Sequence, residues 1–161
     1  MDFGREGIIS IIAGVSGGLI LIFAVDWRYF QDWIVIFLFA GLLDFTFGSP
    51  IVTFNLIQYP IRLLPDYYQT SILFELWILP ILCILYNQVI RERSFWPIVS
   101  YAILFSAGIT VIEYFVELHT DLIQYIKWSW RTSFYTLTIT FLISRFFIVF
   151  YRWGCGYFSH K

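Results

Sequence analysis

The stretch VIEYFVELHT, residues 111–120, carries two carboxylates and an imidazole within an otherwise apolar sequence. These groups belong to Glu113, Glu117 and His119. Such side chains can bind a hard cation, relay a proton or, with a transition metal, activate water. Because residues i and i+4 are neighbours on one face of a helix, Glu113 and Glu117 should lie one turn apart. The spacing therefore predicts a polar site on a helix that is otherwise suited to lipid.

The composition indicates the class of protein that holds this site. The 161 residues are 60% hydrophobic and 22% aromatic, and only 13% are charged. A soluble domain is nearer half apolar and about a quarter charged, so the chain belongs to the membrane class, with the lipid bilayer as a partner. The net charge of −1 argues against a nucleic-acid-binding surface. Cys83 and Cys155 have neither metal-ligand spacing nor the pattern of a disulfide framework.

Five segments are long enough to cross a bilayer when roughly 20 apolar residues are needed for each crossing. They cover about 7–25, 33–53, 71–90, 96–117 and 132–153. We therefore expect an all-α integral membrane protein, a single domain over 1–161 with about five transmembrane helices. Gly48-Ser49-Pro50 should kink or end the second helix, and Pro80 should kink the third. The prolines and tyrosines near 55–70 predict an interfacial or re-entrant segment.

Four ionisable residues fall in the interior of these spans, with Glu117 at a border, and a charge costs about 2.5–3.5 kcal/mol at the helix centre. They are Asp44, Glu75, Glu113 and Arg145. Glu75 follows the start of its span by about four residues, and Glu113 precedes the end of its span by about four. At 1.5 Å per residue, both carboxylates should lie roughly 6 Å below the same membrane surface. Asp44 should lie nearer the midplane.

The loops on that side add Arg62, His119, Asp121, Lys127 and Arg131. The spacing thus predicts an ion- or partner-binding cluster at one interface, with these members: Glu75, Glu113, Glu117, Asp44, His119, Lys127 and Arg131. In one interpretation the cluster is structural. Lys127 or Arg131 then neutralises Glu113 or Glu117, the loop 118–131 folds back over the bundle, and the protein is a structural or accessory subunit of a membrane complex.

In a second interpretation the carboxylates supply oxygens to a cation or relay a proton, and the protein is a transport-linked module with no cofactor except such a cation. In a third, His119 and the carboxylates hold a catalytic metal. The pattern E-x3-E-x-H lacks the E-x-x-H spacing of di-iron bundles and the H-E-x-x-H spacing of zincins. An enzyme is therefore the least favoured interpretation.

Three further features bear on packing and orientation. Gly14 and Gly18 allow close helix approach, either within the chain or between two copies in a homo-oligomer. Arg145 should snorkel toward the opposite surface, with Asp26 or Asp32 as its partner. The distribution of Lys and Arg predicts an outside N-terminus and a cytoplasmic C-terminus. That orientation places five basic residues in the cytoplasm: Arg28, Arg91, Arg93, Arg152 and Lys161.

Two runs, ILFELWILPILCILYNQ (72–88) and IEYFVELHTDLIQYIKWSWRTSFYTLTITFLISR (112–145), carry a family likeness. They resemble a family of small, uncharacterised polytopic membrane proteins of Bacillus- and Clostridium-like spore-forming bacteria. The likeness covers about two-thirds of the chain. Its shared features are the acidic residue before a proline in the third span, the E-x3-E pair, and the stretch from Thr120 to Trp130. The resemblance implies a multi-pass protein of a bacterial plasma membrane and transfers no activity.

Overall fold

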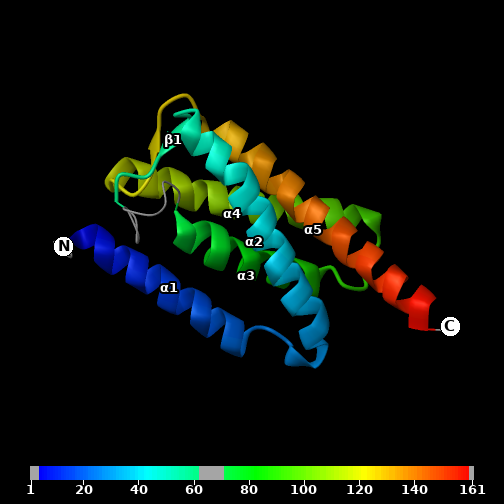
Figure 1. The fold of residues 1–161 in the computed structure, drawn as a ribbon. Coiled ribbons are helices and arrows are strands. Elements are labelled where there is room, and N and C mark those ends of the chain that lie inside the picture. The colour runs from blue at the N-terminus through cyan, green and yellow to red at the C-terminus, as the bar shows by residue number, and fades with distance from the viewer. Residues whose placement is uncertain (1–3, 62–70, 160–161) are drawn as a thin grey trace.

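The computed structural model describes residues 4–61 and 71–159, and the described chain is mainly helical (Figure 1). Its elements in chain order are α1 (Arg5–Phe23), η1 (Trp27–Tyr29), α2 (Phe30–Thr53), β1 (Ile57–Gln58), η2 (Phe74–Ile78), α3 (Leu79–Val89), α4 (Phe95–His119), β2 (Gln124–Tyr125) and α5 (Trp130–Ser159). The predicted all-α class is confirmed.

Three helical stretches are long and apolar enough to cross a membrane: Trp27–Thr53, Phe95–His119 and Trp130–Tyr157. They contain the predicted spans 33–53, 96–117 and 132–153. The spans predicted at 7–25 and 71–90 correspond to the shorter apolar helices Gly7–Phe23 and Phe74–Val89. In Figure 1 the start of α1 lies at the opposite end of the bundle from the turn between α3 and α4 and from the C-terminus.

The short helix α3 is the centre of the bundle, since it contacts each of the other four α-helices. Most of its residues are buried, including Tyr86 and Asn87. The Tyr86 ring lies 5.1 Å from the ring of Phe141 on α5 and 5.9 Å from that of Phe105 on α4. Asn87 donates a hydrogen bond of 2.9 Å to the hydroxyl of Ser144 on α5. Aromatic packing and one buried polar contact thus connect α3 to two neighbours.

Next to Pro80 the regular α-helix is interrupted by a π turn, and the kink that the sequence predicts there stays a prediction. Because proline has no N–H for the carbonyl four residues earlier, the helix cannot run regularly through this point. The five residues Phe74–Ile78 form a π-helical turn, and the N–H of Leu79 bonds to the carbonyl of Phe74. Glu75 lies in this turn. Such wide turns are frequent at functional sites.

The glycines of α1 pack against this π turn. The indole N–H of Trp77 donates a bond of 3.1 Å to the Gly14 carbonyl. A Cβ on Gly17 would lie 3.1 Å from the same indole nitrogen, and one on Gly18 would lie 3.9 Å from the ring. These contacts agree with the intramolecular alternative for the small residues of α1. A homo-oligomer through Gly14 and Gly18 stays a prediction.

The second helix does not end at Gly48-Ser49-Pro50, as one alternative predicted, but continues to Thr53. It stops in a Schellman motif, in which Asn55 takes the left-handed conformation at φ 53°. The Leu56 N–H bonds to the Ile51 carbonyl, and the Asn55 N–H bonds to the Val52 carbonyl. This turn directs the chain out of α2 and into β1.

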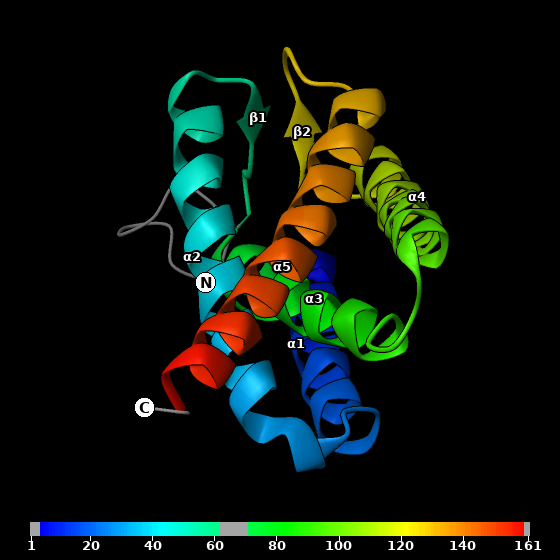
Figure 2. The same ribbon diagram turned by 90° about the vertical axis from the view of Figure 1, so that its right-hand side faces the viewer.

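The strands β1 and β2 form a two-stranded antiparallel ribbon that the sequence did not predict. Ile57 pairs with Tyr125 and Gln58 with Gln124. The Ile126 and Lys127 N–H groups each donate a bond of 3.1 Å to the Leu56 carbonyl. Figure 2 shows the ribbon between the end of α2 and the start of α5. The predicted interfacial segment is described only to Ile61, so its remainder, with Arg62, lies outside the described residues.

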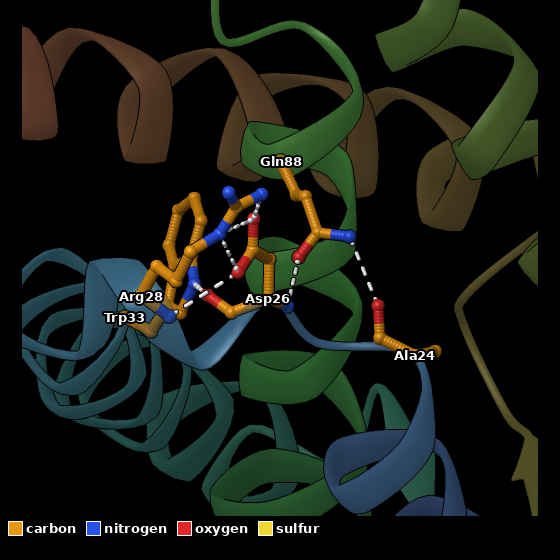
Figure 3. A network of polar contacts seen from close by, with 5 residues as sticks. All are labelled: Ala24, Asp26, Arg28, Trp33 and Gln88. Atoms are coloured by element: carbon orange, nitrogen blue, oxygen red, sulfur yellow. Dashed lines mark hydrogen bonds and ion pairs between the residues drawn. The ribbon is translucent and has the colours of Figure 1, made fainter.

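The other end of the bundle is held by a hydrogen-bond network between the α1–α2 turn and α3 (Figure 3). The Gln88 side chain accepts a bond of 2.9 Å from the Asp26 N–H and donates one of 2.9 Å to the Ala24 carbonyl. The Trp33 indole donates to the Asp26 carbonyl at 2.7 Å, and Arg28 pairs with the Asp26 carboxylate. This arginine lowers the pKa of Asp26 below its ordinary value.

The partners predicted for Arg145 are wrong, because other arginines hold those carboxylates. Arg28 pairs with Asp26, and Arg152 pairs with Asp32. Arg145 instead donates a bond of 3.1 Å to the carbonyl of Arg91, just beyond the C-terminal end of α3. A cation is favourable there, because helix carbonyls without partners gather at a C-terminus.

Candidate functional site

The candidate site lies at the ribbon end of the bundle, where carboxylates from three elements act on one tyrosine. Burial raises the pKa of Tyr59, and the carboxylates of Glu75, Glu113 and Asp44 raise it further, in that order. Since this effect requires proximity, Tyr59 lies near carboxylates of η2, α4 and α2. We call Asp44, Glu75, Glu113, Tyr59 and Tyr125 the carboxylate–tyrosine cluster.

Glu75 is the most enclosed member of the cluster, with 3% of its surface exposed. Its carboxyl group lies directly against Gly48 of α2. A Cβ at position 48 would lie 2.9 Å from the carboxyl carbon and closer still to Oε1. Only glycine therefore leaves room for Glu75 beneath this turn of α2.

Glu113 is the final acceptor in a short chain of hydrogen-bonded side chains. The Tyr125 hydroxyl donates to Glu113 Oε2 at 3.1 Å and lies 3.2 Å from the Ser133 hydroxyl. The Trp128 indole donates to the Ser133 hydroxyl at 2.9 Å. Because the Tyr125 proton points to the carboxylate, Ser133 donates to Tyr125, and all three donors are oriented toward Glu113. Burial, followed by the charge of Glu113, raises the pKa of Tyr125, so this tyrosine remains a donor at neutral pH.

Asp44 lies on the wall of a cavity of about 400 Å³ between α2 and α5. The cavity is mainly apolar, and the side chains of Thr136 and Thr140 also line it. Within the part of the chain that the structure describes, Asp44 makes no hydrogen bond or ion pair. No ion pair among the described residues therefore balances the charge of this carboxylate.

Four predicted members lie at the edge of the cluster or outside it. Glu117 is partly buried and makes a small contribution to the raised pKa of Tyr125. His119 is exposed, and its Nδ1 lies 2.9 Å from the Phe115 carbonyl of its own helix. Arg131 lies over the ring of Trp130, and Lys127 is exposed.

The predicted salt bridges from Lys127 or Arg131 to Glu113 or Glu117 do not form among residues 4–61 and 71–159. The ion pairs found there are Arg28 with Asp26 and Arg152 with Asp32, both at the other end of the bundle. The loop after α4 does fold back, as the first interpretation predicted, but it brings Tyr125 and not a cation to Glu113.

The described residues also contain no group of three or more His, Cys, Asp or Glu side chains placed to hold a metal ion. The carboxylates of Asp44, Glu75 and Glu113 all lie near Tyr59, and Glu113 also lies close enough to Asp44 to act on it. His119 is remote from their centre because it is directed back along its own helix.

The sequence did not identify Gly48, Tyr59, Tyr125 or Ser133 as members of the site. One signal was present, since Tyr125 and Trp128 belong to the stretch Thr120–Trp130 that carries the family likeness. Neither protein-family models, nor curated proteins, nor solved structures give a match to the chain.

The close contact at Gly48 generates a matched pair of predictions. Gly48→Ala should displace the Glu75 carboxyl and lower the free energy of unfolding by about 1–3 kcal/mol, the usual cost of overpacking. Gly108→Ala should be neutral or stabilising, because a Cβ at position 108 meets nothing within 4 Å. Thermal and chemical unfolding in detergent micelles measure the change in stability of the two variants. Equal stability of the two variants would show that α2 does not pass over Glu75.

Proposed function

We propose that the chain is an integral membrane protein whose carboxylate–tyrosine cluster binds and releases a proton. Support for insertion comes from the distribution of side chains. Large aromatic residues are exposed on the outside, among them Phe23 at 81%, Trp96 at 76% and Phe146 at 75%. Polar residues such as Asn87, Ser106 and Ser144 are buried inside. This arrangement suits a lipid environment, since an apolar surface of this extent would be a liability in water.

The observation that carries the proton assignment is the pairing of Glu113 with neutral donors. Tyr125 donates to Glu113, and no Lys or Arg within the described ranges forms an ion pair with it or with Asp44. A carboxyl group enclosed by apolar side chains needs a proton or a cation to offset its charge. The absence of a metal-holding group among the same residues favours the proton.

Each residue then has a role that follows from its position. Glu113 is the proton-binding group, and Tyr125 holds its carboxyl oxygen through a hydrogen bond that Ser133 and Trp128 orient. Asp44 is a second acceptor, and Tyr59 lies near all three carboxylates. Chains of this kind, with carboxylates joined by hydroxyl groups, mark proton pathways in membrane proteins.

Infrared spectroscopy of the protein in lipid, recorded as a function of pH, tests this assignment. We expect a protonated carboxyl band that disappears in Glu113→Gln. Tyr125→Phe should move this band to higher frequency, because a hydrogen bond to the carboxyl oxygen is lost. Tyr135→Phe is the control, since Tyr135 is 64% exposed and distant from the carboxyl group in the chain. A band unchanged in Tyr125→Phe and still present in Glu113→Gln would refute the role of Glu113.

We further propose five crossings of a bacterial plasma membrane, with the N-terminus and the ribbon outside and the C-terminus in the cytoplasm. The arginines support this orientation. Arg28, Arg91, Arg145 and Arg152 all lie at the end opposite the ribbon, and basic residues accumulate on the cytoplasmic side.

Cysteine labelling tests the orientation. In a Cys155→Ser background, Gln124→Cys in the ribbon should react with an impermeant maleimide added to intact cells. Arg93→Cys, in the α3–α4 turn, should react only after the membrane is opened. Both positions are exposed in the structure, so a difference reports sidedness. The reverse labelling pattern would show that the orientation is opposite to the one proposed. Equal labelling of the two positions would contradict the proposal that they lie on different sides of the membrane.

A further inference from the structure

A cavity of about 190 Å³ opens beside Glu113, and it is separate from the cavity that Asp44 lines. Residues of α1, the π turn η2, α3 and α4 form its walls, and Leu122 and Ile123 of the loop after α4 also line it. From the loop the cavity extends along α4 to Ile109. This is one helical turn below Glu113, or about 6 Å. The cavity thus runs from the membrane surface inward.

Among the described residues, the lining of this cavity has one charged group in an apolar setting. Apart from the carboxylate of Glu113, the polar residues of the described lining are Ser10 and Ser71, and the remainder are apolar side chains such as Ala13, Phe74 and Ile78. Tyr125 donates to Glu113 Oε2, and the Glu113 carboxylate also forms part of the cavity wall. A ligand in the cavity can therefore interact with this carboxylate.

The chemistry of the lining selects the ligand. A hard metal ion needs about six or more oxygen ligands, and one carboxylate with two hydroxyl groups does not provide them. An organic cation needs only charge complementarity at one point and apolar walls around the rest. The volume also matches, because a cavity of about 150 Å³ lined by apolar side chains accommodates benzene. The Phe74 ring adds a surface that attracts ammonium groups.

We propose that this cavity binds a lipophilic ammonium ion with an apolar group of about benzyl size. The ammonium group lies against Glu113 and the apolar group lies toward Ile109. The cation and the proton then compete for the Glu113 carboxylate, so binding of one releases the other. This competition rests on the proposed function, in which Glu113 is the proton-binding group. Binding of a cation in the cavity does not depend on that function.

Binding of benzyltrimethylammonium to the full chain in lipid nanodiscs tests the proposal, measured by calorimetry. We expect saturable binding that weakens as the pH falls. The neutral isostere neopentylbenzene should bind at least about tenfold more weakly, because it lacks the charge that Glu113 complements. Equal binding of the two compounds would overturn the proposal, since it would indicate partition into lipid.

Matched variants locate the site. Glu113→Gln should weaken binding of the cation about tenfold or more, whereas Glu117→Gln should stay within about twofold. Glu117 is one turn away on the same helix and does not line the cavity. Ala13→Leu fills the cavity without changing any charge and should weaken binding to a similar extent. Unchanged binding in both Glu113→Gln and Ala13→Leu would overturn the site.

The two proposals fail in different ways. If the infrared band of Glu113 titrates but benzyltrimethylammonium does not bind, the cavity proposal is wrong and the proton assignment stands. If the cation binds and Glu113→Gln removes binding, but the affinity is independent of pH, the cavity is confirmed as a cation site and competition with the proton is refuted.

Discussion

The pairing of Ile57 and Gln58 with Tyr125 and Gln124 is the contact on which the site depends. It joins the connection after α2 to the connection after α4, although these segments are far apart in sequence. Alternation along a strand directs Ile57 and Tyr125 to one face, and Gln58 and Gln124 to the other. Ile57 is buried, and Gln58 and Gln124 are exposed, so the Tyr125 face points into the bundle. Without this register, the Tyr125 hydroxyl would not reach Glu113.

The two ends of the bundle pair their carboxylates in opposite ways. At the arginine end, Asp26 and Asp32 have guanidinium partners, and Gln88 bonds to backbone groups of the α1–α2 turn. At the ribbon end, Glu113 is paired with the neutral hydroxyl of Tyr125, and Asp44 faces a cavity. Cavities flank the cluster on both sides, one at Asp44 and one at Glu113. An end held by ion pairs suits a fixed structure, whereas carboxylates beside neutral donors and open volume suit an exchangeable ligand.

Much of the helical framework could be predicted from the sequence, because length and apolar composition determine it directly. The position of Glu75 and Glu113 at one end followed from helical rise, whereas the sequence placed Asp44 nearer the midplane. The neighbours of these carboxylates could not be predicted. Whether Lys127 or Tyr125 reaches Glu113 is decided by the strand register, and two residues of strand are too short to leave a periodic signal. Pro80 indicated a break, yet only packing decides between a kink and a π turn. The role of Gly48 depends on Glu75, which lies on another element.

The strand register is tested most directly by disulfide formation between two introduced cysteines, Gln58→Cys and Gln124→Cys. The native cysteines are first removed by Cys83→Ala and Cys155→Ser. Gln58 and Gln124 are directly opposed across β1 and β2, and opposed Cα atoms lie about 4.5–5.5 Å apart, within the reach of a disulfide. The account predicts rapid cross-linking in native membranes, and little for Gln58→Cys with Ile126→Cys, which is displaced by two residues. Preferential cross-linking of the displaced pair would contradict it, because Tyr125 would then no longer be opposite Ile57.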